Sequence, residues 1–161
     1  MKKFTQHLKK PVFFSFCLFF LTAATVPADE EAGAIQEALT RYYDSGTDGV
    51  NLRRFEINVT NTGFCKYKKY YKNGKTELFS FNLLRFKAMA YYGTNVKGEL
   101  CLFTRNDDVI VQTHNDRKGD IDTMAMQLVI PLKQIEAEQL NHLADQFKRF
   151  HQRLTTAGKA E

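Results

Sequence analysis

Histidine and cysteine side chains are where chemistry would first be sought in this chain. His142 and His151 are nine residues apart in a segment of helical periodicity, so they project in different directions and cannot share a metal ion. His114 has Asp116 close by, and a Ser or Cys brought near by folding would complete a hydrolytic triad. The chain lacks the spacings typical of zinc sites and of nucleophile elbows. We therefore expect no metal and no cofactor, and a small hydrolase-like enzyme using His114 is the alternative function.

Two cysteines, Cys65 and Cys101, lie outside the N-terminal segment. In an oxidising compartment two cysteines usually pair, which predicts a Cys65–Cys101 disulfide. Strand alternation argues against it. Cys65 is in phase with Tyr67, on the expected inner face, whereas Cys101 is out of phase with Leu100 and Leu102 and falls on the outer face.

A basic and aromatic segment is the strongest surface signal. Between residues 51 and 87 there are nine basic residues and two acidic ones. Basic side chains beside aromatic rings are typical of surfaces that bind anionic polymers and lipid head groups. Period-two alternation places Lys66, Lys68, Tyr70 and Lys72 on one face of a strand, and the predicted binding residues are Lys66, Lys68, Tyr70, Lys72 and Lys75. The competing explanation is that lysines protect an edge strand from aggregation.

The overall charge does not indicate nucleic-acid binding. The formal net charge of +5 depends on four lysines in the first ten residues, and without residues 1–28 there are 19 basic and 18 acidic residues. We therefore expect no nucleic-acid partner. Residues 99–145 are net acidic, so basic and acidic patches are opposed, and self-association of two copies through these patches is a further expectation.

The first 28 residues have the pattern of a signal peptide. A basic start is followed by an uncharged apolar run and by Val26-Pro27-Ala28, which predicts cleavage after Ala28. The run is short for a membrane span, and an uncleaved signal anchor is the alternative. We therefore expect an exported protein, periplasmic or secreted, with a single domain over residues 29–161.

Two helices are expected at the ends of this domain. Apolar residues at helical spacing predict a short helix over residues 29–43, with Ile35 and Leu39 on its buried side. A longer helix is predicted over residues 136–155 because its apolar residues are spaced three and four apart. That seam consists of Leu140, Leu143, Phe147, Phe150 and Leu154.

The residues between the helices are strand-like. Asn73-Gly74 predicts a hairpin with a type I′ turn, and Asn106-Asp107 predicts a second hairpin between residues 98–105 and 108–115. Alternation over residues 124–132 predicts one final strand, in which Pro131 must lie near the end or on an edge. The class is α+β, with six or seven antiparallel strands in a sheet or a partly closed barrel and the long C-terminal helix packed on it.

Seven strands closed by a C-terminal helix resemble the pleckstrin-homology-like barrel, and an open curved sheet around the helix is the alternative. The residues themselves favour a non-catalytic exported binding or interaction domain. Its basic-aromatic hairpin would engage an anionic polymer, a lipid surface or a protein partner.

Overall fold

The computed structural model describes residues 28–47 and 49–158, so the predicted signal segment lies outside the described residues except for Ala28. The class is α+β, as predicted. The helices of the described residues are α2 (Ala28–Tyr42), the short 3₁₀ helix η2 (Leu83–Arg85) and α3 (Ala137–Ala157). The strands are β1 (Leu52–Val59), β2 (Phe64–Tyr71), β3 (Thr76–Asn82), β4 (Phe86–Gly93), β5 (Lys97–Thr104), β6 (Val109–His114), β7 (Asp122–Ala125) and β8 (Gln127–Lys133).

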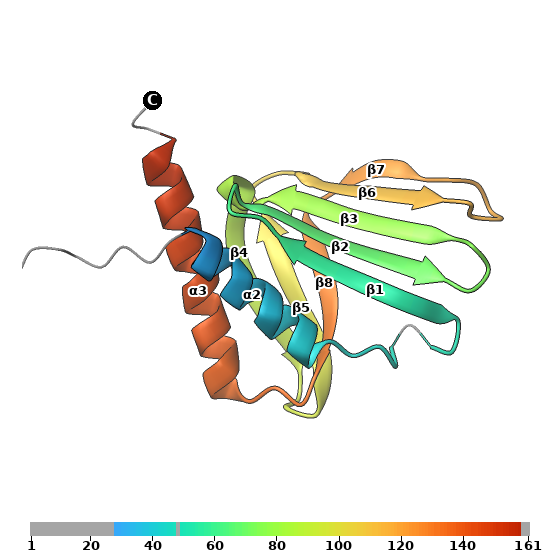
Figure 1. The fold of residues 1–161 in the computed structure, drawn as a ribbon, viewed down its shortest axis with the longest axis horizontal. Helices are drawn as coiled ribbons and strands as arrows, with labels where there is room; N and C mark the ends of the chain where they lie inside the picture. Colours follow the sequence, from blue (N-terminus) through green and yellow to red (C-terminus); the bar gives the residue numbers. More distant parts are fainter. Residues whose placement is uncertain (1–27, 48, 159–161) are drawn as a thin grey trace, which may run out of the picture.

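The eight strands form two antiparallel sheets, which corrects the expectation of one sheet with six or seven. The larger sheet has the order β1-β2-β3-β6-β7, and the smaller has the order β4-β5-β8. The strands do not close into a barrel, so the count that suggested a pleckstrin-homology-like barrel does not hold. In Figure 1 both helices lie at one end of the five-stranded sheet, whose other end extends beyond them.

The chain changes sheet three times, between β3 and β4, between β5 and β6, and between β7 and β8. The predicted second hairpin is therefore wrong, because β5 pairs with β4 and β8 whereas β6 pairs with β3 and β7. The predicted final strand is divided at Met126, whose carbonyl accepts a hydrogen bond from the Thr104 amide (2.9 Å). Alternation of apolar residues continues across this break, so the pattern carries no sign of it.

The hairpin of β2 and β3 is confirmed, with a different turn from the one predicted. Its register pairs Cys65 with Phe81 and Tyr67 with Phe79. Gly74 has a positive φ of 86°, but Asn73 is not among the residues with positive φ, so the turn is not type I′. A four-residue connection results, in which the Gly74 amide donates to the Tyr71 carbonyl (3.1 Å).

The core lies where the two helices meet both sheets. Ile35 and Leu39 of α2 and Phe147 and Phe150 of α3 are fully buried, which confirms both predicted helical seams. Phe147 stacks on Phe86 of β4, with ring centroids 5.6 Å apart. Among the described residues, neither helix is long and apolar enough to cross a membrane.

The edges of the sheets are partly covered. Pro131 lies in β8, an edge strand, as predicted, and its carbonyl accepts a hydrogen bond from the Asp44 amide (2.9 Å). At the β1 edge, Gln36 of α2 accepts hydrogen bonds at Oε1 from the Val59 amide (2.9 Å) and from Asn58 (3.2 Å). Helix α2 therefore caps one end of the larger sheet's first strand.

Candidate binding surface

Strand β2 presents two different faces. Cys65 and Tyr67 point into the core and are buried, and this side is called the inner face of the five-stranded sheet. Lys66, Lys68 and Tyr70 alternate with them and point to the opposite, outer face, as predicted from period-two spacing. Lys72 lies beyond the end of β2 in the exposed turn, so it adjoins this face instead of lying within it.

The outer side chains of β1 and β2 interact with one another. Arg54 contacts Glu56 through an ion pair of 2.7 Å, and its guanidinium carbon lies 3.9 Å from the centre of the Tyr70 ring. The Tyr70 hydroxyl donates to the other Glu56 oxygen (3.0 Å), and Lys68 Nζ lies 4.8 Å from the same ring. We call the set Arg54, Glu56, Lys66, Lys68 and Tyr70 the basic-aromatic face.

Lys75 does not belong to the basic-aromatic face. It is held on the other side of the sheet by ion pairs to Glu77 (2.8 Å) and to Asp116 (2.7 Å). Lys69 also points inward and pairs with Glu77 (2.9 Å), whose second contact is a hydrogen bond from the Tyr71 hydroxyl (3.0 Å). Of the five predicted binding residues, Lys75 is therefore separated from the other four, and it forms a salt-bridged network with Lys69, Glu77 and Asp116.

The inner network shifts the pKa values of its members. Burial raises the pKa of the Glu77 carboxyl, but hydrogen bonds from Lys75 and Lys69 outweigh this and hold it below its ordinary value. The Lys75 hydrogen bond, followed by the Lys118 amide, lowers the pKa of Asp116. Hydrogen bonds to Asp116 and Glu77 raise the pKa of Lys75. These shifts mean that the charged forms of all three groups stabilise the fold.

The network predicts a specific acid sensitivity. Because the folded-state pKa of Glu77 is lowered, its contribution to stability is complete above its unfolded pKa of about 4.3 and is lost as the pH falls through the folded value. Glu77→Gln should cost about 1–3 kcal/mol at pH 7, because two lysines lose a half-buried partner. Thermal melts between pH 7 and pH 3 should show this difference shrinking below pH 4, and a constant difference would contradict the assignment.

The predicted disulfide is not formed, which corrects that expectation. Cys65 and Cys101 are both free and buried. Cys65 lies on the inner face of β2, whereas Cys101 is in β5 of the other sheet and pairs in register with Ala90 and Val129. Since Leu100 and Leu102 point into the core, Cys101 points away from it, as strand alternation indicated. Burial raises the pKa of the Cys65 thiol to about 12.

The histidines occupy three separate environments. His114 is exposed and pairs in register with Thr76, which places it on the outer face, opposite to Cys65. Its sequence neighbour Asp116 is bonded to Lys75. His151 is half-buried and donates through Nδ1 to the Leu83 carbonyl (2.7 Å), so it joins α3 to η2. No group of three metal-binding side chains occurs in the part of the chain that the structure describes.

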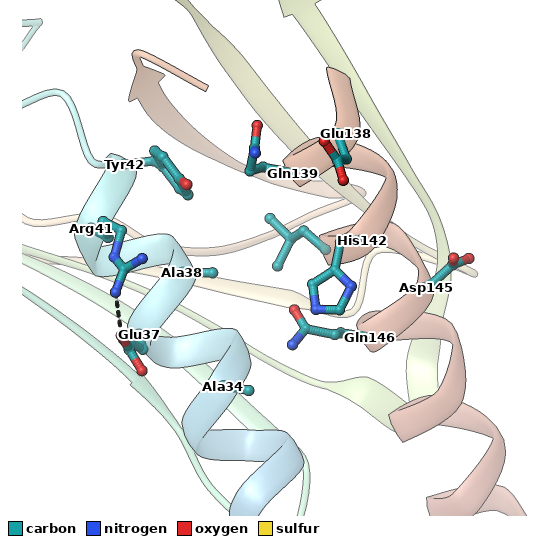
Figure 2. A pocket seen from close by; sticks show the side chains of 11 residues that line it. Ala34, Glu37, Ala38, Arg41, Tyr42, Glu138, Gln139, His142, Asp145 and Gln146 are labelled. Atoms are coloured by element: carbon teal, nitrogen blue, oxygen red, sulfur yellow. Dashed lines mark hydrogen bonds and ion pairs between the residues drawn. The ribbon is translucent and has the colours of Figure 1, made fainter. Parts of the chain in front are cut away.

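A crevice between α2 and α3 was not predicted from the sequence. It is open to solvent and has a volume of about 600 Å³. Figure 2 shows Ala34 and Ala38 of α2 facing His142 and Gln146 of α3 across it. Two alanines four residues apart on one helix face were the available signal, because small side chains leave space between neighbouring helices. Its charged lining residues are Glu37, Arg41, Glu138 and Asp145, of which Arg41 is paired with Glu37 (2.6 Å), so carboxylates outnumber cations there.

Comparison of the chain with models of protein families, with curated proteins and with solved structures finds no match in any of the three.

Proposed function

We propose that this protein is a non-catalytic exported domain that binds an anionic ligand through its basic-aromatic face. The observation that carries the proposal is the contrast between the two sides of one hairpin. The inner lysines, Lys69 and Lys75, are neutralised by carboxylates at 2.7–2.9 Å. Lys66 and Lys68 have no carboxylate within 4.0 Å among the described residues, so their charge is available to a ligand.

Glu56 does not compensate these two lysines. It is the register partner of Lys68, but one of its oxygens is paired with Arg54 and the other accepts from Tyr70. Strand order also removes the competing explanation. β2 lies between β1 and β3, so lysines on it do not protect an edge of the sheet. Uncompensated charge beside an aromatic ring in a central strand is typical of a binding surface.

Several anionic ligands fit this chemistry, and they are candidates for the same face. A polyanion such as a sulfated or phosphorylated polymer would bind mainly by charge. A lipid surface would add its head groups, and a protein partner, including the net acidic region over residues 99–145 of a second copy, would add carboxylates. Binding to immobilised heparin tests the shared requirement, which is attraction of a dense negative charge.

The salt dependence of heparin binding should show whether three lysines of this hairpin contact the ligand. Replacing Lys66, Lys68 and Lys72 together by Gln should make the logarithmic dependence of heparin affinity on salt shallower by about 2–3, since each neutralised charge contributes about 0.7–0.9 in the nucleic-acid case. The melting temperature should change little, because Lys66 and Lys72 are exposed and the half-buried Lys68 has no ion pair among the described residues. Elution from a heparin column over a salt gradient measures the first effect.

A matched control uses lysines elsewhere on the surface. Lys87, Lys133 and Lys148 are exposed and lie on β4, β8 and α3, so replacing them by Gln removes the same net charge from other places. This triple variant should keep the wild-type salt dependence. Elution of wild-type protein and of the first triple variant at the same low salt would refute the proposed function, and sedimentation at low salt would then test self-association.

A further inference from the structure

The basic-aromatic face continues into apolar surface on the same side of the sheet. The register places Lys66 opposite Ser80, Ser80 opposite Ile110, and Ile110 opposite Met124. These four residues form one row that crosses β2, β3, β6 and β7 on the outer face. Strands are spaced about 4.8 Å apart, so the row measures roughly 14 Å from Lys66 to Met124.

Large apolar side chains in this region are exposed. Ile110 is 38% exposed, Met124 is 49% exposed, and Phe64, at the start of β2, is 43% exposed. Phe64 has the same alternation as Lys66, whose Nζ lies 6.0 Å from its ring centre. An outer sheet face that carries three such side chains beside uncompensated lysines is amphipathic, and exposed apolar groups gathered in this way mark interaction sites.

We propose that the outer face of the five-stranded sheet docks on an anionic lipid bilayer, an inference that rests on the proposed function and names its ligand. Lys66 and Lys68 would contact anionic head groups, while Phe64, Ile110 and Met124 enter the interface between head groups and acyl chains. A soluble polyanion offers charge but nothing apolar, so it leaves the apolar half of the face in water. An anionic bilayer can contact the lysines through its head groups and bury the apolar side chains at the same time.

Asp122 of β7 opposes the docking, because among the described residues it has no ion pair, whereas Glu56 on the same face is paired with Arg54. Asp122 of β7 lies on the outer face, since its register partner Gln112 lies in the row of Leu78 and Lys68. Asp122 accepts a hydrogen bond from Gln112 (3.2 Å), and no cation lies within 4.0 Å of it among the described side chains. Its charge would be repelled by an anionic surface, which weakens the attachment. Removing that charge should strengthen binding.

Vesicle co-sedimentation of the exported domain, residues 29–161, tests the lysines and the apolar residues of the outer face separately. The probes are phosphatidylcholine vesicles with and without 30% phosphatidylserine, and soluble heparin is the second ligand. Lys66→Gln with Lys68→Gln should weaken binding to anionic vesicles about 25-fold, at about fivefold for each lysine. Ile110→Thr with Met124→Thr should weaken vesicle binding roughly tenfold and leave heparin binding unchanged. Asp122→Asn should strengthen vesicle binding about fivefold.

The results that would contradict the bilayer inference differ from those that would contradict the proposed function. Val96→Thr changes an exposed apolar residue between β4 and β5 of the other sheet, and it should not alter vesicle binding. If circular dichroism shows that the Ile110→Thr/Met124→Thr variant is unstable, Met124→Thr alone replaces it as the test of the apolar residues. If the threonine variants bind vesicles as wild type does while the lysine variant loses both ligands, the bilayer inference is wrong and the proposed function stands. If wild-type protein binds neither heparin nor vesicles, the proposed function itself fails.

Discussion

Phe147→Ala is expected to lower the free energy of unfolding by about 3–5 kcal/mol. The Phe147 side chain is fully buried, and its ring stacks on Phe86 of β4 with an interplanar angle of 20°. It holds the middle of α3 against the rest of the domain, next to the hydrogen bond from His151 to Leu83. Truncation would leave a cavity bounded by α3, η2 and β4, which the rigid strand side cannot fill.

Chemical denaturation followed by circular dichroism measures this loss. Lys148 is the matched control, because it is the next residue of α3 and is exposed. Lys148→Ala should change the unfolding free energy by no more than about 0.5 kcal/mol. A domain of this size has a total stability of about 5–15 kcal/mol, so the Phe147 variant should lose a large part of it. Melting of that variant within a few degrees of wild type would show that α3 is not docked as described.

Gly93→Ala is expected to destabilise the protein by about 2–4 kcal/mol. Gly93 ends β4 opposite Gly98 of β5 and has a φ of 149°. An added Cβ would lie 2.4 Å from the Gly98 Cα and 2.5 Å from the Lys97 carbonyl oxygen. Both neighbours are backbone atoms that cannot move away as a side-chain end can. The variant must therefore distort the turn between β4 and β5 or the register of that hairpin.

A glycine in a different setting provides the control. Gly33 lies inside α2 and is exposed, and a Cβ added there would meet no atom within 4 Å. Gly33→Ala should therefore stabilise the protein by about 0.5–1 kcal/mol through helix propensity. Opposite signs for these two Gly→Ala changes in thermal melts are the expected result. Equal and small effects at both positions would contradict the close Gly93–Gly98 contact.

The parts of the fold that depend on local sequence were predictable. Spacing of apolar residues located both helices to within one or two residues, and Gly74 marked the connection between β2 and β3. Pairing between strands was not predictable in the same way. Asn106-Asp107 has the composition of a hairpin turn, but it connects strands of different sheets because each strand finds partners distant in sequence. Alternation records which face a residue occupies and carries no information on the neighbouring strand.

In the candidate site, too, local spacing was predictable from the sequence and contacts between distant segments were not. Alternation placed Lys66, Lys68 and Tyr70 together, because faces of one strand follow from spacing alone. It could not show that Lys75 is paired with Asp116, since that contact depends on the loop after β6. The apolar half of the outer face was missed for the same reason, as Ile110 and Met124 join Lys66 only through pairings across four strands. For the cysteines, alternation was a better guide than the redox argument.

The three changes of sheet have a consequence for the kinetics of folding. The β1–β2–β3 meander and the β4–β5 hairpin consist of neighbours in sequence and can form early, at a small cost in loop entropy. β6 then has to reach β3 across the whole β4–β5 hairpin, and β8 has to reach β5 across β6 and β7. The two sheets are thus interleaved along the chain, and each is completed by a pairing between strands that are distant in sequence. We expect the formation of these long-range strand pairings to be the slow step of folding. Domains with mostly non-local β pairings typically fold in about milliseconds to seconds.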